Sequence, residues 1–171
     1  MGDSSGLSIH LLKAGDIPII AAACAALDWD KPAAQYEGYL AEQRRGEREA
    51  LVAWQGEVFV GYVTIVWTSD YAPFRDAEVP EISDFNVLPH VRRQGIGSQL
   101  LDEAERRIAE RSRVAGIGVG LFADYGAAQR LYVKRGYVPD GRGIISHGRR
   151  VTRGDSVVVD DDLILYFTKT L

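Results

Sequence analysis

Apolar residues recur with two different periods along this chain, and the period changes at turn-forming residues. Alternation of apolar and polar residues predicts a strand, and apolar residues at every third or fourth position predict an amphipathic helix. Asp16 and Pro18 are typical of a helix start, and Gln55-Gly56 is typical of a tight turn. The N-terminal part is therefore predicted to contain a strand over 7–12, helices over 16–27 and 33–45, and a hairpin of strands over 49–54 and 57–67.

The rest of the chain begins with a polar, proline-bearing stretch over 69–80, which predicts an irregular loop. Three glycines alternate in the apolar run that ends at Leu121, and they predict close backbone approach at this run. Residues 141–155, with several glycines and arginines, predict a flexible connection. The predicted elements are strands over 81–88, over 117–121, from 137 and over 163–168, with helices from 96 and over 126–135.

Length and composition are those of an ordinary soluble domain. A chain of 171 residues can fill one core, burying roughly 70% of its unfolded surface, and we expect a single domain over 7–171 after a flexible N-terminus over 1–6. The net charge of -4 argues against a nucleic-acid partner, and Cys24 is the only cysteine, so no intrachain disulfide can form. Without a membrane-spanning apolar run or the features of a signal peptide, the sequence predicts a cytoplasmic protein with no membrane partner.

The stretch between the predicted strand over 81–88 and the next helix carries two glycines one residue apart, Gly95 and Gly97. Without side chains there, a bulky anion can reach the backbone amides, and the helix dipole places positive charge behind them. The nucleoside-triphosphate loop would need a lysine after the second glycine, and the dinucleotide fingerprint would need glycine at Leu100. The residues predict a phosphate site of another kind, formed by Arg92, Arg93, Gln94, Gly95, Ile96, Gly97 and Ser98.

A second motif follows the apolar run over 117–121 and reads Ala128-x-x-Leu131-Tyr132-x-x-x-Gly136-Tyr137. With Arg92-x-x-Gly95-x-Gly97 before it and the predicted elements between them, the chain resembles the GNAT superfamily of acetyl-CoA-dependent N-acetyltransferases. The resemblance covers the element order from Leu7 to Leu171. One departure is Tyr125, which stands where the family often has asparagine.

The resemblance implies a single-domain α/β (α+β) fold, with a mixed, mostly antiparallel central sheet of six to seven strands and about four helices, splayed between the fourth and fifth strands. It implies acetyl-CoA as cosubstrate, with the pyrophosphate on residues 92–98 and the pantetheine arm along the backbone of Phe85, Asn86 and Val87. It also implies that the acetyl group passes directly to a primary amine and that Tyr132 protonates the leaving thiolate. No metal is expected, because His10, His90 and His147 are isolated in the sequence.

A base is needed, because an alkylammonium with a pKa of about 10.4 must lose its proton before it attacks the thioester. Glu81 is the first candidate, since it lies on the strand before the phosphate site, at the offset where family members with a glutamate base carry it. Strand alternation puts Glu81, Phe85 and Val87 on one face and Asp84 on the other. Asp84 is the second candidate and Glu78 the third.

The acceptor is less well defined by the sequence. Acidic residues in the two loops that flank the acceptor cleft in the resembled family favour a small cationic amine. Alternatives are a protein or peptide amine, a non-catalytic sensor of acetyl-CoA, and an interaction domain without cofactor. The last hairpin is compatible with a homodimer, and Asp160-Asp161-Asp162 is predicted to form a solvated turn. The acidic loop residues are Asp28, Asp30, Asp70, Asp76 and Glu78.

Overall fold

The computed structural model describes residues 6–171, so the predicted flexible segment over 1–6 lies outside the described residues except for Gly6. The chain divides into two compact units. The first comprises the described residues up to Trp67 together with Ile82–Arg107, and the second comprises Thr68–Glu81 and Ile108–Leu171. The predicted single domain over 7–171, and the predicted splay of its sheet, stay predictions.

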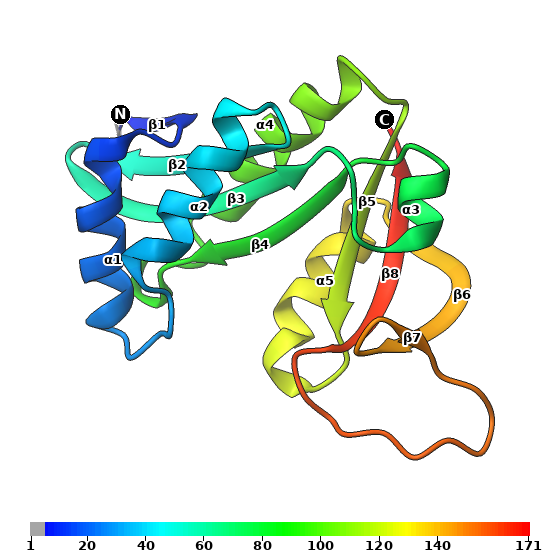
Figure 1. The fold of residues 1–171 in the computed structure, drawn as a ribbon. Coiled ribbons are helices and arrows are strands. Elements are labelled where there is room, and N and C mark those ends of the chain that lie inside the picture. Colours follow the sequence, from blue (N-terminus) through cyan, green and yellow to red (C-terminus); the bar gives the residue numbers. More distant parts are fainter. Residues whose placement is uncertain (1–5) are drawn as a thin grey trace. The chain divides into compact units, whose positions relative to one another are not determined.

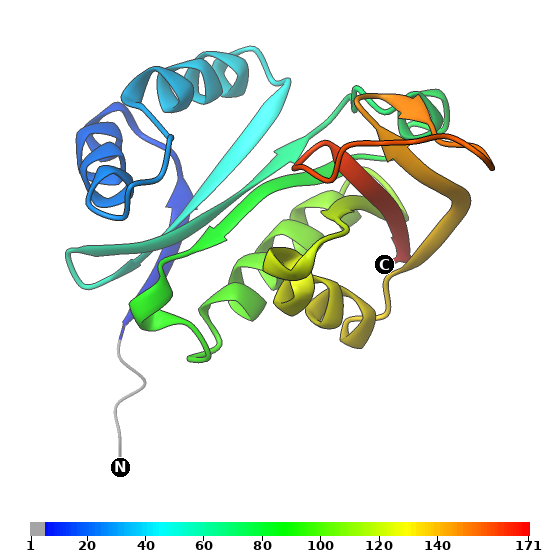
Figure 2. The same ribbon diagram turned by 90° about the horizontal axis from the view of Figure 1, so that it is seen from below.

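In the first unit, four strands follow one another in the order β1-β2-β3-β4, and the pairs β1-β2 and β2-β3 are antiparallel. Helices α1 and α2 cover one face of these strands and α4 covers the other (Figures 1 and 2). The elements are β1 (Leu7–Leu11), η1 (Ala14–Asp16), α1 (Ile17–Ala25), α2 (Ala33–Arg44), β2 (Arg48–Gln55), β3 (Val58–Val66), β4 (Glu81–Val87), η2 (Pro89–Val91) and α4 (Ile96–Ala109).

One core cluster of the first unit lies between the two N-terminal helices and the strands, and it is rich in aromatic rings. The ring of Tyr36 on α2 meets Tyr62 on β3 edge to face, at 5.5 Å between centroids, a favoured aromatic geometry. Cys24 is buried in the same cluster, and its sulfur lies 3.4 Å from the Tyr36 hydroxyl. The apolar faces of α1 and α2 therefore fix where the α1–α2 loop meets the strands.

The second unit contains the strands in the order β5-β8-β6-β7, all paired antiparallel. The pairing of β6 with β8 shifts register between Pro139 and Ile144, a stretch that contains Gly141 and Gly143, and β6 continues beyond it to Ser146. Its elements are α3 (Ala72–Asp76), β5 (Val114–Gly120), η3 (Ala123–Tyr125), α5 (Gly126–Lys134), β6 (Val138–Ser146), β7 (Arg149–Arg150) and β8 (Leu163–Thr170).

The alternating glycines of β5 are covered by aromatic and aliphatic side chains from elsewhere in the second unit, and not by another backbone as their spacing predicts. A Cβ atom on Gly116 would lie 2.3 Å from the Phe74 ring, and one on Gly120 would lie 2.4 Å from the Tyr125 ring. On Gly118 it would lie 3.0 Å from Tyr166. The strand therefore leaves room for rings that another residue type would displace.

Two elements correct the sequence-based assignment. The predicted loop over 69–80 contains α3, because Phe74 is buried against Gly116 and the Tyr166 ring, contacts that the local sequence does not reveal. The predicted flexible connection over 141–155 contains the end of β6 and the short β7. The described residues thus form eight strands and five α-helices, against six to seven and about four predicted. The α/β class with mostly antiparallel pairing is confirmed.

None of the helices in the described part of the chain is long and apolar enough to cross a membrane.

Candidate functional site

The predicted phosphate site lies in the first unit, between the end of β4 and the start of α4. Arg93 and Gly95 both have positive φ angles, 63° and 82°, so the backbone curls where the helix begins. The first hydrogen bond of this helix is donated by the Gln99 amide to the Gly95 carbonyl, at 3.0 Å. The amides of Ile96 and Gly97 lie before it, in the first turn, where helix amides have no carbonyl partner within the helix. Such a curled segment at a helix N-terminus turns successive amides toward one point, as anion binding requires.

Two contacts hold this segment on β4. The Nε of Arg92 donates a hydrogen bond of 3.0 Å to the carbonyl of Val87, which anchors the guanidinium stem at the end of the strand. A Cβ atom on Gly97 would lie 3.0 Å from the Phe85 ring and 3.5 Å from Val87. Gly97 therefore lets α4 approach β4 closely, a packing reason that adds to the predicted need for uncovered amides.

Strand β4 is not regular throughout, because Asp84 has a φ of 45°. A positive φ at a non-glycine residue is uncommon and interrupts the pleat. The alternation from Glu81 to Val87 therefore cannot be extended through residue 84. After residue 84, the side chains of Phe85 and Val87 lie against Gly97. The side chains of Asp84 and Asn86 point to a polar cluster and contact each other there.

The carboxylate of Asp84 accepts hydrogen bonds from five side chains of the first unit. Burial would raise the pKa of Asp84, but the charge and hydrogen bond of Lys31, together with the hydroxyls of Tyr62 and Tyr39, outweigh it and hold the pKa below its usual value. An ionised carboxylate with every lone pair engaged is a poor proton acceptor, which argues against the candidate role of Asp84 as a base. The donors are Lys31 Nζ (2.7 Å), Gln35 Nε2 (2.9 Å), Tyr39 Oη (2.8 Å), Tyr62 Oη (2.6 Å) and Asn86 Nδ2 (2.9 Å).

Replacement of Asp84 by asparagine is expected to destabilise the protein by about 3 kcal/mol at pH 7, because it leaves the mostly buried ammonium of Lys31 without a counter-charge. Since the folded-state pKa of Asp84 is depressed, its contribution is present above the unfolded pKa of about 3.8 and is lost as the pH falls through the folded value. Urea unfolding of both proteins between pH 3 and 7 measures this, and the difference should shrink toward acid pH.

The control for this variant is Glu47→Gln, which removes one partner of the exposed Arg45–Glu47 pair and should change stability little. A difference between wild type and Asp84→Asn that stays constant from pH 7 to pH 3 would contradict the assigned role of the ionised carboxylate.

Glu81, the first residue of β4, belongs to the second unit, and its surroundings there are polar. Ser69 Oγ donates a hydrogen bond to Glu81 Oε2. The Ser69 Oγ also accepts a hydrogen bond of 3.0 Å from the amide of Tyr71. Burial raises the pKa of the Tyr166 hydroxyl, and the negative charges of Glu81 and Asp70 raise it further. Glu81 is therefore linked to Ser69 and, through Ser69, to the Tyr71 amide, contacts that the sequence alone does not indicate.

Tyr132 lies on α5, also in the second unit, and its side chain is 5% exposed. Its ring lies 6.1 Å from that of Tyr137, and its hydroxyl forms no hydrogen bond with any residue between 6 and 171. Burial raises the pKa of this hydroxyl and the nearby Tyr125 raises it further, so Tyr132 stays protonated at neutral pH. It is thus available as a proton donor.

The predicted site residues are divided between the units. Residues 85–87 and 92–98 lie in the first unit, whereas Glu81 and Tyr132 lie in the second. Asn86, predicted to contribute its backbone, also uses its side chain to contact Tyr62 at 3.2 Å.

Tyr125 occupies the position where the motif departs from the family pattern. Its hydroxyl donates a hydrogen bond of 2.8 Å to Asp161, and its ring packs over Gly120. The residue thus acts through packing and through one bond to the loop before β8, rather than through a side-chain amide.

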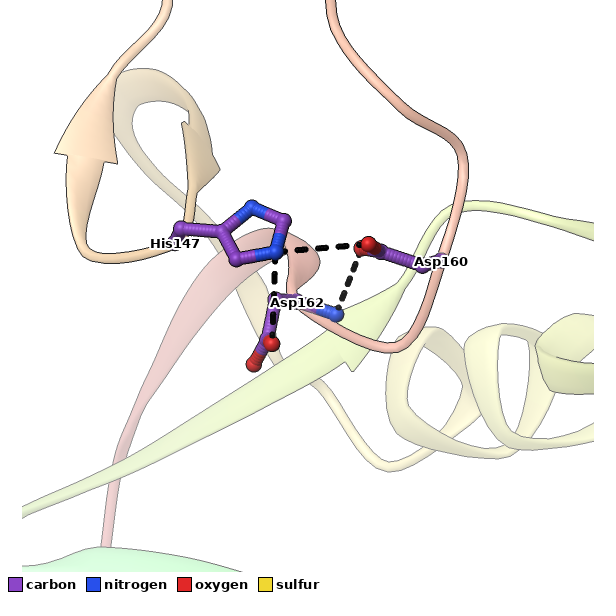
Figure 3. A group of neighbouring side chains, drawn as sticks. All are labelled: His147, Asp160 and Asp162. Carbon is purple, nitrogen blue, oxygen red and sulfur yellow. Dashed lines mark hydrogen bonds and ion pairs between the residues drawn. The ribbon is translucent and has the colours of Figure 1, made fainter.

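His147 is not isolated in space, although it is in the sequence. Figure 3 shows its Nε2 facing the carboxylates of Asp160 and Asp162, at 3.3 and 3.6 Å. His147 and Gly148, both with positive φ angles, form the two-residue β6–β7 turn. The His147 amide donates a hydrogen bond of 3.1 Å to the Asp162 carbonyl, which holds this turn beside residues 160–162. The predicted solvated turn at 160–162 therefore also forms an ion pair with His147 when the imidazole is protonated.

The comparisons with known proteins agree with this geometry. Residues 18–137 match the family model described as the acetyltransferase (GNAT) family. No curated protein matches the chain at a significant level.

Several solved structures share the fold at low sequence identity. Ribosomal-protein-alanine N-acetyltransferase from Brucella melitensis is 21% identical, with a TM-score of 0.68 over 96% of this chain and 99% of that chain. The acetyltransferase from Salmonella typhimurium that modifies the N-terminal serine of ribosomal protein L7/L12 is 12% identical, with a TM-score of 0.71 over 99% and 96%. The yncA protein of Salmonella typhimurium, solved with its cofactor acetyl-CoA, is 19% identical, with a TM-score of 0.64 over 96% and 93%.

Proposed function

The chain belongs to the acetyltransferase (GNAT) family, and from this premise we propose that it transfers the acetyl group of acetyl-CoA to a small primary amine by direct attack in a ternary complex. The curled segment from Arg92 to Gly97 is the observation that carries the proposal. The proposal is supported by the positive φ angles at Arg93 and Gly95 and by two glycines that leave the backbone amides beside them uncovered. The pyrophosphate of the cosubstrate would bind there, with Arg92 beside it.

The pantetheine arm would pair with the backbone of residues 85–87, in the manner of an added strand. Asp84 supports this role, because its five hydrogen bonds hold the irregular backbone just before Phe85. One amide of this segment would donate to the thioester carbonyl and stabilise the oxyanion that forms during attack.

Glu81 is proposed as the base. At pH 7, removing a proton from an alkylammonium costs on the order of 4 to 5 kcal/mol, so a carboxylate close to the amine accelerates the reaction. The ammonium proton passes to Glu81, the neutral nitrogen bonds to the thioester carbon, and the carbon–sulfur bond breaks. The leaving thiolate takes its proton from the hydroxyl of Tyr132, which burial keeps protonated. The nitrogen loses its second proton as the amide forms, and a proton from solvent restores the Tyr132 hydroxyl.

The acceptor is proposed to be a small amine that is cationic in solution. Among the acidic loop residues that favour such an amine, Asp70 lines a cavity of the second unit. Two of the similar structures are named for acetylating ribosomal proteins. Their sequence identities of 21% and 12% support a shared fold but not a shared acceptor.

Thiol release from acetyl-CoA tests the function, measured across aminoglycosides, polyamines, amino acids and short peptides with hydrolysis subtracted. A saturable small amine supports the proposal. Release with peptides alone would assign a protein acceptor, and binding of acetyl-CoA without release would assign a sensor.

Replacement of Glu81 by glutamine is expected to lower the rate by about 10²-fold at pH 7 and by less near pH 10, where the amine loses its proton without help. The pH–rate profile of thiol release under saturating amine measures the effect. Glu57→Gln, an exposed glutamate in the β2–β3 turn, is the matched control and should leave the profile unchanged. A loss that is equal at all pH values would show that Glu81 has a structural role.

A further inference from the structure

The second unit contains a cavity of about 340 Å³ whose wall includes a pair of stacked tyrosines. The rings of Tyr71 and Tyr166 lie 3.7 Å apart between centroids and 3° from parallel. Its volume is at the lower end of the range for small-molecule sites, roughly 300 to 1,000 Å³, so it suits a compact ligand.

Two residues of the cavity wall, Tyr71 and Tyr166, are connected to Glu81. Tyr71 is joined to Glu81 through Ser69, whose hydroxyl bonds the carboxylate and accepts the Tyr71 amide. Tyr166 stacks on Tyr71, and its hydroxyl experiences the negative charge of Glu81. Glu81 does not line the cavity itself, but Ser69 connects it to the tyrosine wall.

Two arginines line the cavity, and neither guanidinium forms an ion pair with a carboxylate of the described residues 6–171. Arg142 follows Asp140, which accepts the Arg142 amide at 2.9 Å and the Tyr71 hydroxyl at 2.7 Å, so this turn is fastened to the tyrosine wall. Arg150 lies on β7, immediately after the turn that His147 fastens to residues 160–162. Planar guanidinium groups bind carboxylates and phosphates in bidentate geometry.

One carboxylate, Asp70, lines the same cavity, and its side chain forms no hydrogen bond or ion pair in the described part of the chain. The cavity therefore presents both signs of charge: two guanidinium groups from β6 and β7, and the carboxylate of Asp70 just before α3. A purely cationic amine such as a polyamine would place a positive group against the arginines, which is unfavourable.

We propose that this cavity binds the acceptor and selects a zwitterionic one: a primary amine that also carries a carboxylate or a phosphate, with the anionic group held by Arg142 and Arg150 and the amine directed to Glu81. The inference rests on the proposed function and narrows its substrate class from amines in general to amino-acid-like molecules.

The test compares acceptors that differ only in the anionic group. Thiol release is measured with the standard amino acids and their C-terminal amides, and with 2-aminoethyl phosphate and ethanolamine. The wild-type KM is expected to be at least about tenfold lower for the anionic member of the preferred pair. A preference within the first set assigns a carboxylate, and a preference within the second assigns a phosphate.

Variants distinguish the cavity from other causes of this preference. Arg142→Gln and Arg150→Gln should each reduce the ratio of the two KM values toward one, with kcat for the anionic acceptor little changed. Converting the carboxylate of an amino acid to an amide also lowers the pKa of its amine, which changes the KM by itself. The evidence for the cavity is therefore the difference in the KM ratio between wild type and each variant. Arg149→Gln is the matched control, since Arg149 is exposed beside Arg150 on β7 but does not line the cavity, and it should keep the wild-type ratio.

Equal KM values for anionic and neutral acceptors, or an unchanged ratio in both arginine variants, would overturn the inference. If no amine releases thiol, the proposed function fails, and calorimetric titration of the same compounds without acetyl-CoA then tests the cavity alone. Binding of the anionic members that Arg142→Gln abolishes would support the cavity site, and no binding would overturn it.

Discussion

Replacement of Tyr132 by phenylalanine is expected to lower kcat for acetyl transfer by about 10²-fold or more, while the affinity for acetyl-CoA changes little. The leaving thiolate would then lack its proton donor. The change itself is mild, because the ring keeps its packing beside Tyr137 and the hydroxyl has no hydrogen-bond partner among residues 6–171. Steady-state kinetics with calorimetric titration of acetyl-CoA measure both effects.

Tyr36→Phe is the control for this variant, because it also removes a buried tyrosine hydroxyl, here one beside Cys24. It should affect stability more than turnover. An unchanged kcat in Tyr132→Phe would release Tyr132 from the role of acid and leave the thiolate to be protonated by water.

Replacement of Gly97 by glutamate is expected to weaken acetyl-CoA binding by at least about 100-fold, because it brings a negative charge to the amides that would bind the pyrophosphate. The Cβ atom would also lie 3.0 Å from the Phe85 ring and move the start of α4 away from β4. Calorimetric titration measures the affinity, and circular dichroism reports whether the fold persists.

Gly38→Glu adds the same side chain to an exposed position of α2, with no atom within 4 Å of the new Cβ. It should bind acetyl-CoA as wild type does. Wild-type affinity in a folded Gly97→Glu protein would remove the phosphate assignment from this segment.

The parts of the site that the sequence could predict are those whose reasons are local. A curled helix start needs glycine and free amides within a few residues, so Arg92-x-x-Gly95-x-Gly97 is visible in one stretch of sequence. The alternating glycines of β5 likewise indicated a close approach at this strand, although side chains and not another backbone make it. Element order was predictable for the same reason, since periodicity is a property of neighbouring residues.

The parts that could not be predicted depend on contacts between distant residues. Helix α3 exists because Phe74 packs over Gly116, 42 positions away (116 - 74), and no pattern within 69–80 encodes that contact. The positive φ of Asp84 depends on donors such as Lys31 from the α1–α2 loop. A short helix or an interrupted strand of this kind is determined by packing and hydrogen bonding, which override local propensity.

The glycines of β5 have a consequence for how this sequence can change during evolution. Each glycine leaves the space that a particular ring fills. Replacement of Gly116 by alanine therefore requires a smaller side chain than phenylalanine at residue 74, and Gly120 is coupled to Tyr125 in the same way. Substitutions at these pairs can spread through a lineage only together or through a weakened intermediate. Tyr166 both packs over Gly118 and lines the cavity proposed for the acceptor. If that proposal holds, a substitution at Gly118 would also alter which acceptors the enzyme takes.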